Sequence, residues 1–170
     1  MSEEDEILDI VDEQDIVIGQ RKKSEIYQKG LVNFRVVNVF LKNSQGEIWI
    51  PRRTAHKKLF PLCLDISMGG HVGTGETYED TLQRELKEEL NLELKQVNFQ
   101  QIGYLTPYKN NVSAFMKVYE IYTDTTPMYN RDDYMEAFWL TPQAALQKIQ
   151  NGEPAKTDLP KLIRFFYIPS

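Results

Sequence analysis

Three glutamates crowd one short stretch of the chain, at Glu85, Glu88 and Glu89. If this stretch is helical, offsets of three and four residues place their side chains on one face, one turn apart. Like charges at that spacing repel each other, so the stretch favours a positive partner. Arg84 and Lys87 are near, but a divalent cation compensates three carboxylates better, and carboxylate oxygens suit hard ions such as Mg²⁺ or Mn²⁺. Taken alone, such an acidic run is more often a solvated helix face.

The residues around these glutamates predict a well-defined helix. Thr77 is a favourable N-cap, and Asp80 three residues later completes a pattern like the capping box. Asn91 is expected to end the helix, because Asn tolerates the left-handed conformation of a C-cap. The glutamate face lies beside an apolar stripe, so the helix can bury one side and present its carboxylates along the flank. The stripe repeats at every fourth position: Tyr78, Leu82, Leu86 and Leu90.

A glycine-rich segment precedes this helix, with glycines at 69, 70, 73 and 75 and then Glu76. Glycine permits tight turns and close approach of the backbone to a ligand, although a mobile surface loop is the alternative interpretation. Counting from Gly70, the chain reads G-x5-E-x7-R-E-L-x-E-E-x-N-L. This pattern resembles the Nudix box, G-x5-E-x7-R-E-U-x-E-E-x-G-U, where U is a bulky aliphatic residue. The one departure is Asn91 in place of glycine, an exchange that suits a helix C-cap.

The resemblance extends to the strands around the box and to FWLTP near the end of the chain. It implies an α/β fold, a Nudix α/β/α sandwich with a mixed sheet and an N-terminal β-hairpin. It also implies metal-dependent hydrolysis of a diphosphate linkage in a small nucleotide by attack of water at phosphorus. The substrate would be a nucleoside di- or triphosphate or a related nucleoside diphosphate derivative, and the metal Mg²⁺, with Mn²⁺ an alternative.

Site residues follow from the resemblance position by position. Glu85 and Glu89 would be the principal metal ligands, and Glu88 a further ligand or a base. The backbone carbonyl of Gly69, just before the box, would complete the metal site. Glu76 and Arg84 would form an ion pair that orients the helix against the glycine-rich loop.

A finer resemblance comes from WIPRRTAHKKLFPLCLDISMGGHV and the N-terminal DIVDEQDIVIGQ. Both are similar to the isopentenyl-diphosphate-isomerase-like branch of the Nudix superfamily. Four cations in the first segment are candidates for binding substrate phosphate, with ordinary surface cations as the alternative: Arg52, Arg53, Lys57 and Lys58. Three acidic residues before FWLTP are candidates for a further acid: Asp132, Asp133 and Glu136.

Isomerases of that branch use a catalytic cysteine just before the Gly-His of a C-G-H motif. This chain reads Met68-Gly69-Gly70-His71 there, with no thiol. Cys63, several residues upstream, is interpreted as a small buried residue, and His71 as a partner in a hydrogen bond within the loop. The retained glutamates favour hydrolysis. An isopentenyl-diphosphate isomerase and a catalytically idle nucleotide-binding module remain the alternatives.

The other expected elements alternate between strands and helices. Residues 21–30 are expected to be a polar connection, and 56–63 a loop. A single domain over 1–170 is expected, with residues 1–30 as an N-terminal β extension. Strands are predicted as two short runs within 7–19, a hairpin of 34–43 and 47–53, and runs at 64–68, 92–99, 111–122 and 135–141, and helices at 142–150 and 158–166.

Composition excludes several classes of protein. The net charge of −5 argues against a binder of DNA or RNA, which usually carries a basic excess. No apolar run is long enough for a membrane span, and a single cysteine in 170 residues favours the reducing cytoplasm. The expected partner is therefore a small nucleotide or other diphosphate. Oligomeric state is open, with a homodimer through the N-terminal strands as one arrangement.

Overall fold

One mixed sheet organises the computed structural model, which describes residues 6–169. Residues 1–5 and 170, the two ends of the predicted single domain, lie outside the described part. Within it, six strands form the sheet in the order β6-β7-β3-β4-β8, with β5 paired to β3. Neighbours run antiparallel except β3 and β7, which are parallel. The strands are β3 (Arg35–Lys42), β4 (Ile48–Arg53), β5 (Met68–His71), β6 (Asn98–Leu105), β7 (Phe115–Tyr122) and β8 (Tyr134–Leu140).

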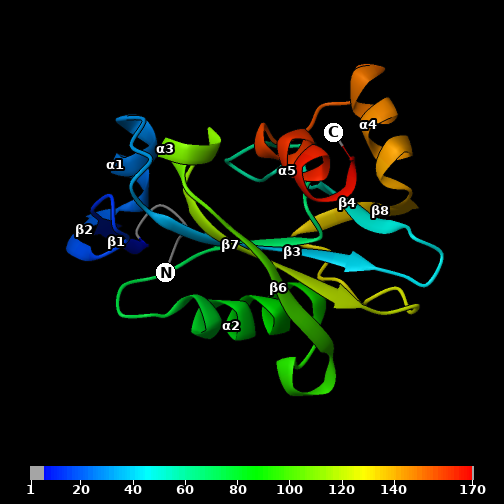
Figure 1. The fold of residues 1–170 in the computed structure, drawn as a ribbon, viewed down its shortest axis with the longest axis horizontal. Helices are drawn as coiled ribbons and strands as arrows, with labels where there is room; N and C mark the ends of the chain where they lie inside the picture. The colour runs from blue at the N-terminus through cyan, green and yellow to red at the C-terminus, as the bar shows by residue number, and fades with distance from the viewer. Residues whose placement is uncertain (1–5, 170) are drawn as a thin grey trace.

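Helices cover both faces of this sheet (Figure 1). The helix α2 lies along one face, and α4 and α5 lie on the other. This arrangement confirms the predicted α/β/α sandwich with a mixed sheet. Among the described residues, none of the helices has the length and apolar character to cross a membrane. The helices are α1 (Lys23–Gln28), α2 (Tyr78–Leu90), α3 (Pro107–Asn110), α4 (Pro142–Gln150) and α5 (Asp158–Tyr167), with a 3-10 turn η2 (Leu94–Gln96).

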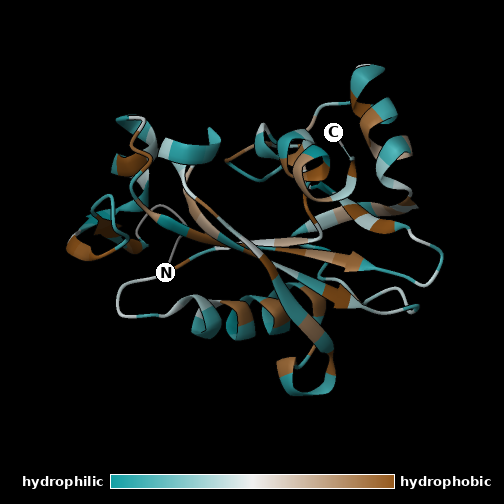
Figure 2. Ribbon diagram, viewed as in Figure 1, coloured by the Kyte–Doolittle hydropathy of each residue, from teal (hydrophilic) through white to brown (hydrophobic). Residues whose placement is uncertain are grey.

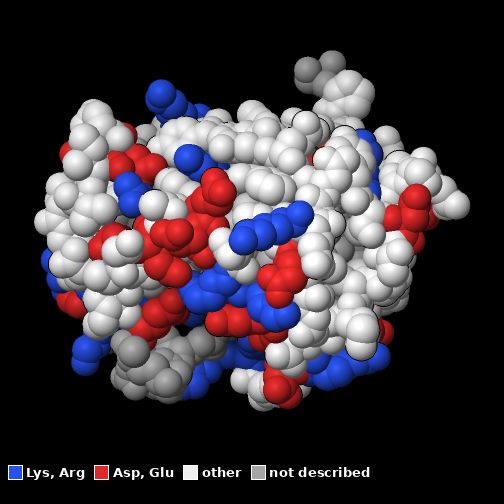
Figure 3. All heavy atoms as spheres, turned by 90° about the horizontal axis from the view of Figure 1, so that it is seen from below, with Lys and Arg blue, Asp and Glu red and all other residues white. Residues whose placement is uncertain are grey.

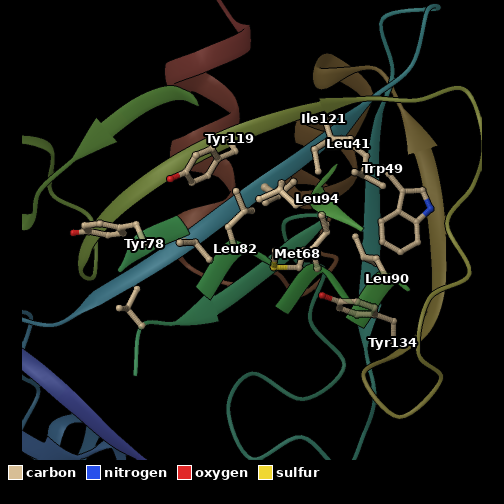
Figure 4. Close-up of a cluster of buried hydrophobic side chains, with 14 residues drawn as sticks. Leu41, Trp49, Met68, Tyr78, Leu82, Leu90, Leu94, Tyr119, Ile121 and Tyr134 are labelled. Atoms are coloured by element: carbon tan, nitrogen blue, oxygen red, sulfur yellow. The ribbon is translucent and has the colours of Figure 1, made fainter. Parts of the chain in front are cut away.

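Buried apolar side chains form two cores between these layers. Figure 2 shows hydrophobic residues recurring along the central strands and the helices that cover them. Under α2, the predicted stripe of the helix packs against side chains of β3, β4 and β7, as Figure 4 shows. The second core lies beneath α4 and α5 and includes Phe40, Ile50 and Leu162. With both faces of the sheet buried, α2 is fixed relative to the strands, and so is whatever its flank presents.

The predicted ends of α2 are confirmed in detail. The hydroxyl of Thr77 accepts the N–H of Asp80 at 3.0 Å, and the carboxylate of Asp80 accepts the N–H of Thr77 at 2.9 Å. Asn91 caps the other end with φ 54° and ψ 35°. Capping at both ends fixes where each glutamate of the helix stands.

An N-terminal module, residues 6–31, packs against one end of the sheet (Figure 1). Its antiparallel hairpin, β1 (Ile7–Val11) and β2 (Val17–Lys22), confirms the predicted N-terminal strands. The expected polar connection after it is wrong, because α1 forms there. That short helix buries only Lys23 and Ile26, which is too few apolar positions to show a helical period. Leu8 and Ile26 share a small core with Phe34 of the following segment.

Two strands lie further along the chain than expected. Only Met68 of the predicted strand 64–68 belongs to β5, because Leu64 makes isolated bridges to Arg52 and Ala155 instead. The predicted strand 92–99 is replaced by η2 and the later β6. A register shift between Gln101 and Gly103 interrupts the alternation of β6, which hides it from a period-two pattern.

Candidate active site

The strands β4 and β5 diverge, and a cleft lies between them. β3 pairs with β5 through Val36–Val39 but with β4 only at Lys42. The predicted hairpin of β3 and β4 is therefore paired only next to its turn. The resulting cleft has a volume of about 740 Å³, and its walls come from α1, β5, α2, the segment 53–66 and the start of α5.

Arg84 anchors α2 to the glycine-rich segment. Its guanidinium donates to both carboxylate oxygens of Glu76, at 2.9 and 2.8 Å. Glu76 also accepts the N–H of Gly73 at 2.8 Å, and the contact with Arg84 is the main cause that lowers the pKa of Glu76. The two residues thus form the ion pair that the resemblance implies, and it ties the helix to the loop before it.

Glu85 is largely enclosed, with a side chain that is 14% exposed. It accepts a bond from Arg84 at 2.8 Å. It also lies against the backbone of Gly70, where an added Cβ would overlap the Cγ of Glu85 and stand 2.7 Å from its Cδ. Glycine at position 70 is therefore required by the close approach of this side chain.

Glu89 lies one turn further along the helix. The hydroxyl of Tyr134 donates to its carboxylate at 3.0 Å. Glu88 between them is far more open, with a side chain that is 57% exposed and 3.5 Å from Arg84. All three glutamates line the cleft together with Gly69 and Gly70.

The electrostatics of these carboxylates suit a divalent cation. Burial raises the pKa of Glu85 to about 7, although Arg84 opposes the shift. Burial, followed by the charges of Glu85 and Asp133, raises the pKa of Glu89 well above its ordinary value. Two ionised carboxylates in such surroundings need positive charge, and oxygen donors are what Mg²⁺ and Mn²⁺ prefer. The donor set therefore fits the expected metal chemically.

The glutamates are not gathered around one point as they stand. Within residues 6–169, no three side chains of His, Cys, Asp or Glu are grouped closely enough to hold a metal ion. Arg84 holds Glu85, and Tyr134 holds Glu89. Binding of a cation by the whole set therefore requires these side chains to exchange partners.

The opposite wall of the cleft is rich in cations. Of the predicted phosphate-binding residues, Arg53 and Lys57 line it. Arg53 donates to Asp65 at 3.0 Å, and Lys57 to Asp133 at 2.7 Å. Acidic and basic side chains also lie interleaved on the surface seen in Figure 3.

The structure does not bring the other two predicted cations to this wall. Among the residues described, those that line the cleft include neither Arg52 nor Lys58. Arg52 instead binds Glu136 at 2.5 Å and Glu153 at 2.9 Å. A register shift in the pairing of β4 with β8 falls between Arg52 and Arg53, and the two guanidiniums bind different carboxylates.

Two further residues of the cleft were missed by sequence reasoning. Asp65 and Lys156 are far apart in the chain, yet their charged groups lie 3.7 Å apart. No local pattern marks either of them. Asp133 was one of three acidic candidates, and it alone of the three lines the cleft, within the residues described.

His71 and Cys63 carry no identified chemistry. His71 does form a hydrogen-bonding contact, but its partner is not in the loop as expected: the hydroxyl of Tyr27, on α1, lies 2.7 Å from Nε2 of His71. Burial, followed by the charges of Lys23, Lys156 and Arg53, holds the pKa of His71 well below its ordinary value. Cys63 is only partly buried, not fully as expected, since it lies in the exposed loop before Leu64.

The family model of the NUDIX domain matches residues 32–161, which is most of the chain. The chain belongs to the Nudix family. An uncharacterized Nudix hydrolase of Nostoc sp. is 65% identical and aligns with 98% of this chain and 99% of its own length. A crystal structure of a Deinococcus radiodurans protein superposes with a TM-score of 0.90 at 45% identity, over 95% of this chain and 99% of that one.

A weaker similarity agrees with the predicted branch of the Nudix superfamily. An isopentenyl-diphosphate Delta-isomerase of Kocuria rhizophila is 26% identical over 84% of this chain and 82% of its own length. Nudix hydrolases generally cleave pyrophosphate bonds in nucleotide-like substrates and use divalent cations such as Mg²⁺. The predicted family is thereby confirmed, with hydrolase chemistry as its general activity.

Proposed function

We propose that this Nudix protein is a Mg²⁺-dependent pyrophosphohydrolase of a small nucleotide, a nucleoside di- or triphosphate or a related nucleoside diphosphate derivative. The observation that carries the proposal is the composition of the cleft. Its α2 wall presents Glu85, Glu88 and Glu89, and its other wall presents Arg53 and Lys57. A diphosphate with its cation has both charges, so it matches both walls.

Each group has a part in the proposed reaction. Glu85, Glu88, Glu89 and the carbonyl of Gly69 would hold the cation, which supplies charge compensation and activates water when bound. A carboxylate of α2 accepts the proton of the attacking water, with Glu88 and Glu85 as the candidates. Arg53 and Lys57 hold the phosphate oxygens in line with that water. The anhydride bond then breaks as the new bond from water oxygen to phosphorus forms.

Two alternative functions, an isomerase and an idle binding module, fit the residues of the cleft less well. The residue at the position of the isomerase cysteine is Gly69, which has no thiol for the proton transfers that move a double bond. An idle binding module has no need of Glu85 packed against Gly70 or of the Arg84–Glu76 anchor. Both features favour a working hydrolase.

A substrate panel tests the proposal directly. The protein is incubated with nucleoside di- and triphosphates, dinucleotides and isopentenyl diphosphate, with and without Mg²⁺, and products are separated by chromatography. We expect phosphate or pyrophosphate release from a nucleotide only when Mg²⁺ is present. Migration of the double bond in isopentenyl diphosphate would identify an isomerase, and tight nucleotide binding without products would identify a binding module.

A further inference from the structure

Asp65 is a buried charge that the proposed chemistry does not use. Its side chain is 3% exposed, and one of its oxygens accepts the N–H of Ile66 at 2.7 Å. Its remaining contacts are with two cations, Arg53 at 3.0 Å and Lys156 at 3.7 Å. A buried carboxylate is costly unless it is paired and hydrogen-bonded, so Asp65 is retained together with these partners.

Lys156 reaches this carboxylate from the other end of the chain. The N–H of Lys156 donates to the carbonyl of Leu64 at 3.0 Å, and the N–H of Leu64 donates to the carbonyl of Pro154 at 2.8 Å. Backbone pairing therefore holds the segment before α5 beside the segment that carries Asp65. The ammonium of Lys156 also lies 5.7 Å from the ring centre of Phe60. Its position is fixed by the backbone and not by the ion pair alone.

Asp65 is a single carboxylate with two cationic partners. Both partners, Arg53 and Lys156, line the cleft. Their charges, with that of Lys23, also lower the pKa of His71 after burial, so they act on the same part of the cleft. By contrast, Lys57 is matched by its own acid, Asp133. Arg53 and Lys156 line the same cleft as the α2 carboxylates, and the charge of Glu89 acts on Arg53, so a phosphate chain bound beside those carboxylates would meet both cations.

We propose that Asp65 is a positioning residue that aims Arg53 and Lys156 into the cleft, and that Lys156 contacts the phosphate chain of the substrate. This inference rests on the proposed function, since it takes a phosphate compound as the ligand. Lys156 then acts as a point charge for phosphate oxygens beside the planar fork of Arg53.

Substitution of Lys156 tests the contact. The variants are Lys156→Gln and Lys156→Arg, and Lys148→Gln is the matched control. Lys148 has the same 29% side-chain exposure and also lies over an aromatic ring, Phe138, but it is not part of the described cleft lining. Affinity for inorganic pyrophosphate is measured by calorimetry, and kcat and KM on the best nucleotide of the substrate panel.

We expect Lys156→Gln to weaken pyrophosphate binding and raise KM by at least about tenfold, the effect of losing one hydrogen bond to a charged group. The kcat should change much less, Lys156→Arg should restore most of the affinity, and Lys148→Gln should leave both constants unchanged. A purely structural role would instead lower the melting temperature without this split between KM and kcat.

Asp65→Asn tests the positioning role. Asp65→Asn should raise KM when Lys156 is present and have a smaller effect on KM in a Lys156→Gln background. The two effects should not add, because both substitutions disrupt the same Asp65–Lys156 ion pair. If Asp65→Asn does not fold, the pair Lys156→Gln and Lys156→Arg decides alone. Normal pyrophosphate affinity and KM in Lys156→Gln would overturn the inference while turnover still supports the hydrolase. A wild-type protein that neither binds pyrophosphate nor hydrolyses any nucleotide would overturn both.

Discussion

The two walls of the cleft are built in different ways. The acidic wall comes from α2 and the loop before it, where Arg84 binds Glu76, Glu85 and Glu88 within a short stretch of sequence. The cationic wall joins distant segments, as the ion pairs Lys57–Asp133 and Lys156–Asp65 show. The first wall is encoded by helical spacing and the second by tertiary folding. If this contrast is correct, changes to the acidic wall should affect turnover, and changes to the cationic wall should affect binding.

The largest effect is expected from Glu89→Gln. Loss of one carboxylate of the proposed metal-binding set should lower kcat by at least about 1000-fold, since metal-ion catalysis supplies several kcal/mol. The fold should persist without metal. The pKa of Glu89 is raised in the folded protein, so ionising it at neutral pH costs stability that glutamine does not cost. Steady-state kinetics and circular dichroism measure both effects.

Glu79→Gln is the matched control, because Glu79 is exposed in the first turn of the same helix. It should keep the kcat of the wild type. A Glu89→Gln variant with near-normal turnover would show that the acidic wall is not the catalytic one.

A substitution outside the helix should also disturb the acidic wall, with the second largest effect. In Gly70→Ala the new Cβ overlaps the side chain of Glu85, which must move. We expect kcat to fall by about 10-fold to 100-fold, because displacement of a catalytic group by about 1 Å has effects of this size. Gly19→Ala is the control, since nothing lies within 4 Å of its added Cβ. Equal kinetics of the two alanine variants would contradict the close packing of Glu85.

These two walls also explain what could be predicted from the sequence. The limits of α2, its caps and its glutamates were foreseeable because they repeat at helical intervals and carry local signals. The membership of Arg53 and Lys57 in the cleft followed from a family resemblance. Asp65 and Lys156 could not be found, because their proximity depends on pairing between the segments around Leu64 and Ala155.

Substitutions in the cationic wall should weaken substrate binding and leave turnover nearly unchanged. Lys57→Gln removes a cation of the cleft, and we expect KM to rise about tenfold with little change in kcat. Because Asp133 loses its partner, the double variant with Asp133→Asn separates loss of attraction from the effect of an unpaired acid. Lys95→Gln, at an exposed site of η2, serves as the control. A fall in kcat with unchanged KM would place Lys57 in the chemistry itself.

The smallest effect concerns the end of the acidic helix. Residue 91 has the left-handed φ of 54°, which Asn tolerates because its side chain can form local hydrogen bonds. Alanine cannot form them, so Asn91→Ala should lower the free energy of unfolding by about 1–2 kcal/mol. Asn91→Gly keeps the left-handed conformation but loses the side-chain hydrogen bond to the carbonyl of Met128. Its free energy of unfolding should therefore lie between those of the alanine variant and the wild type. Urea unfolding measures the differences. A kcat altered more than about twofold by either variant would mean that the cap also shapes the site.

The N-terminal module has a practical consequence for anyone who trims this protein. The family match begins at residue 32, which suggests that a truncated protein could start there. Yet Lys23 and Tyr27 lie upstream of it and line the cleft, and Leu8 and Ile26 cover Phe34. Such a truncation would expose apolar side chains such as Phe34 and remove one wall of the cleft. Domain borders taken from family similarity alone would therefore cut through the structural unit that forms the cleft.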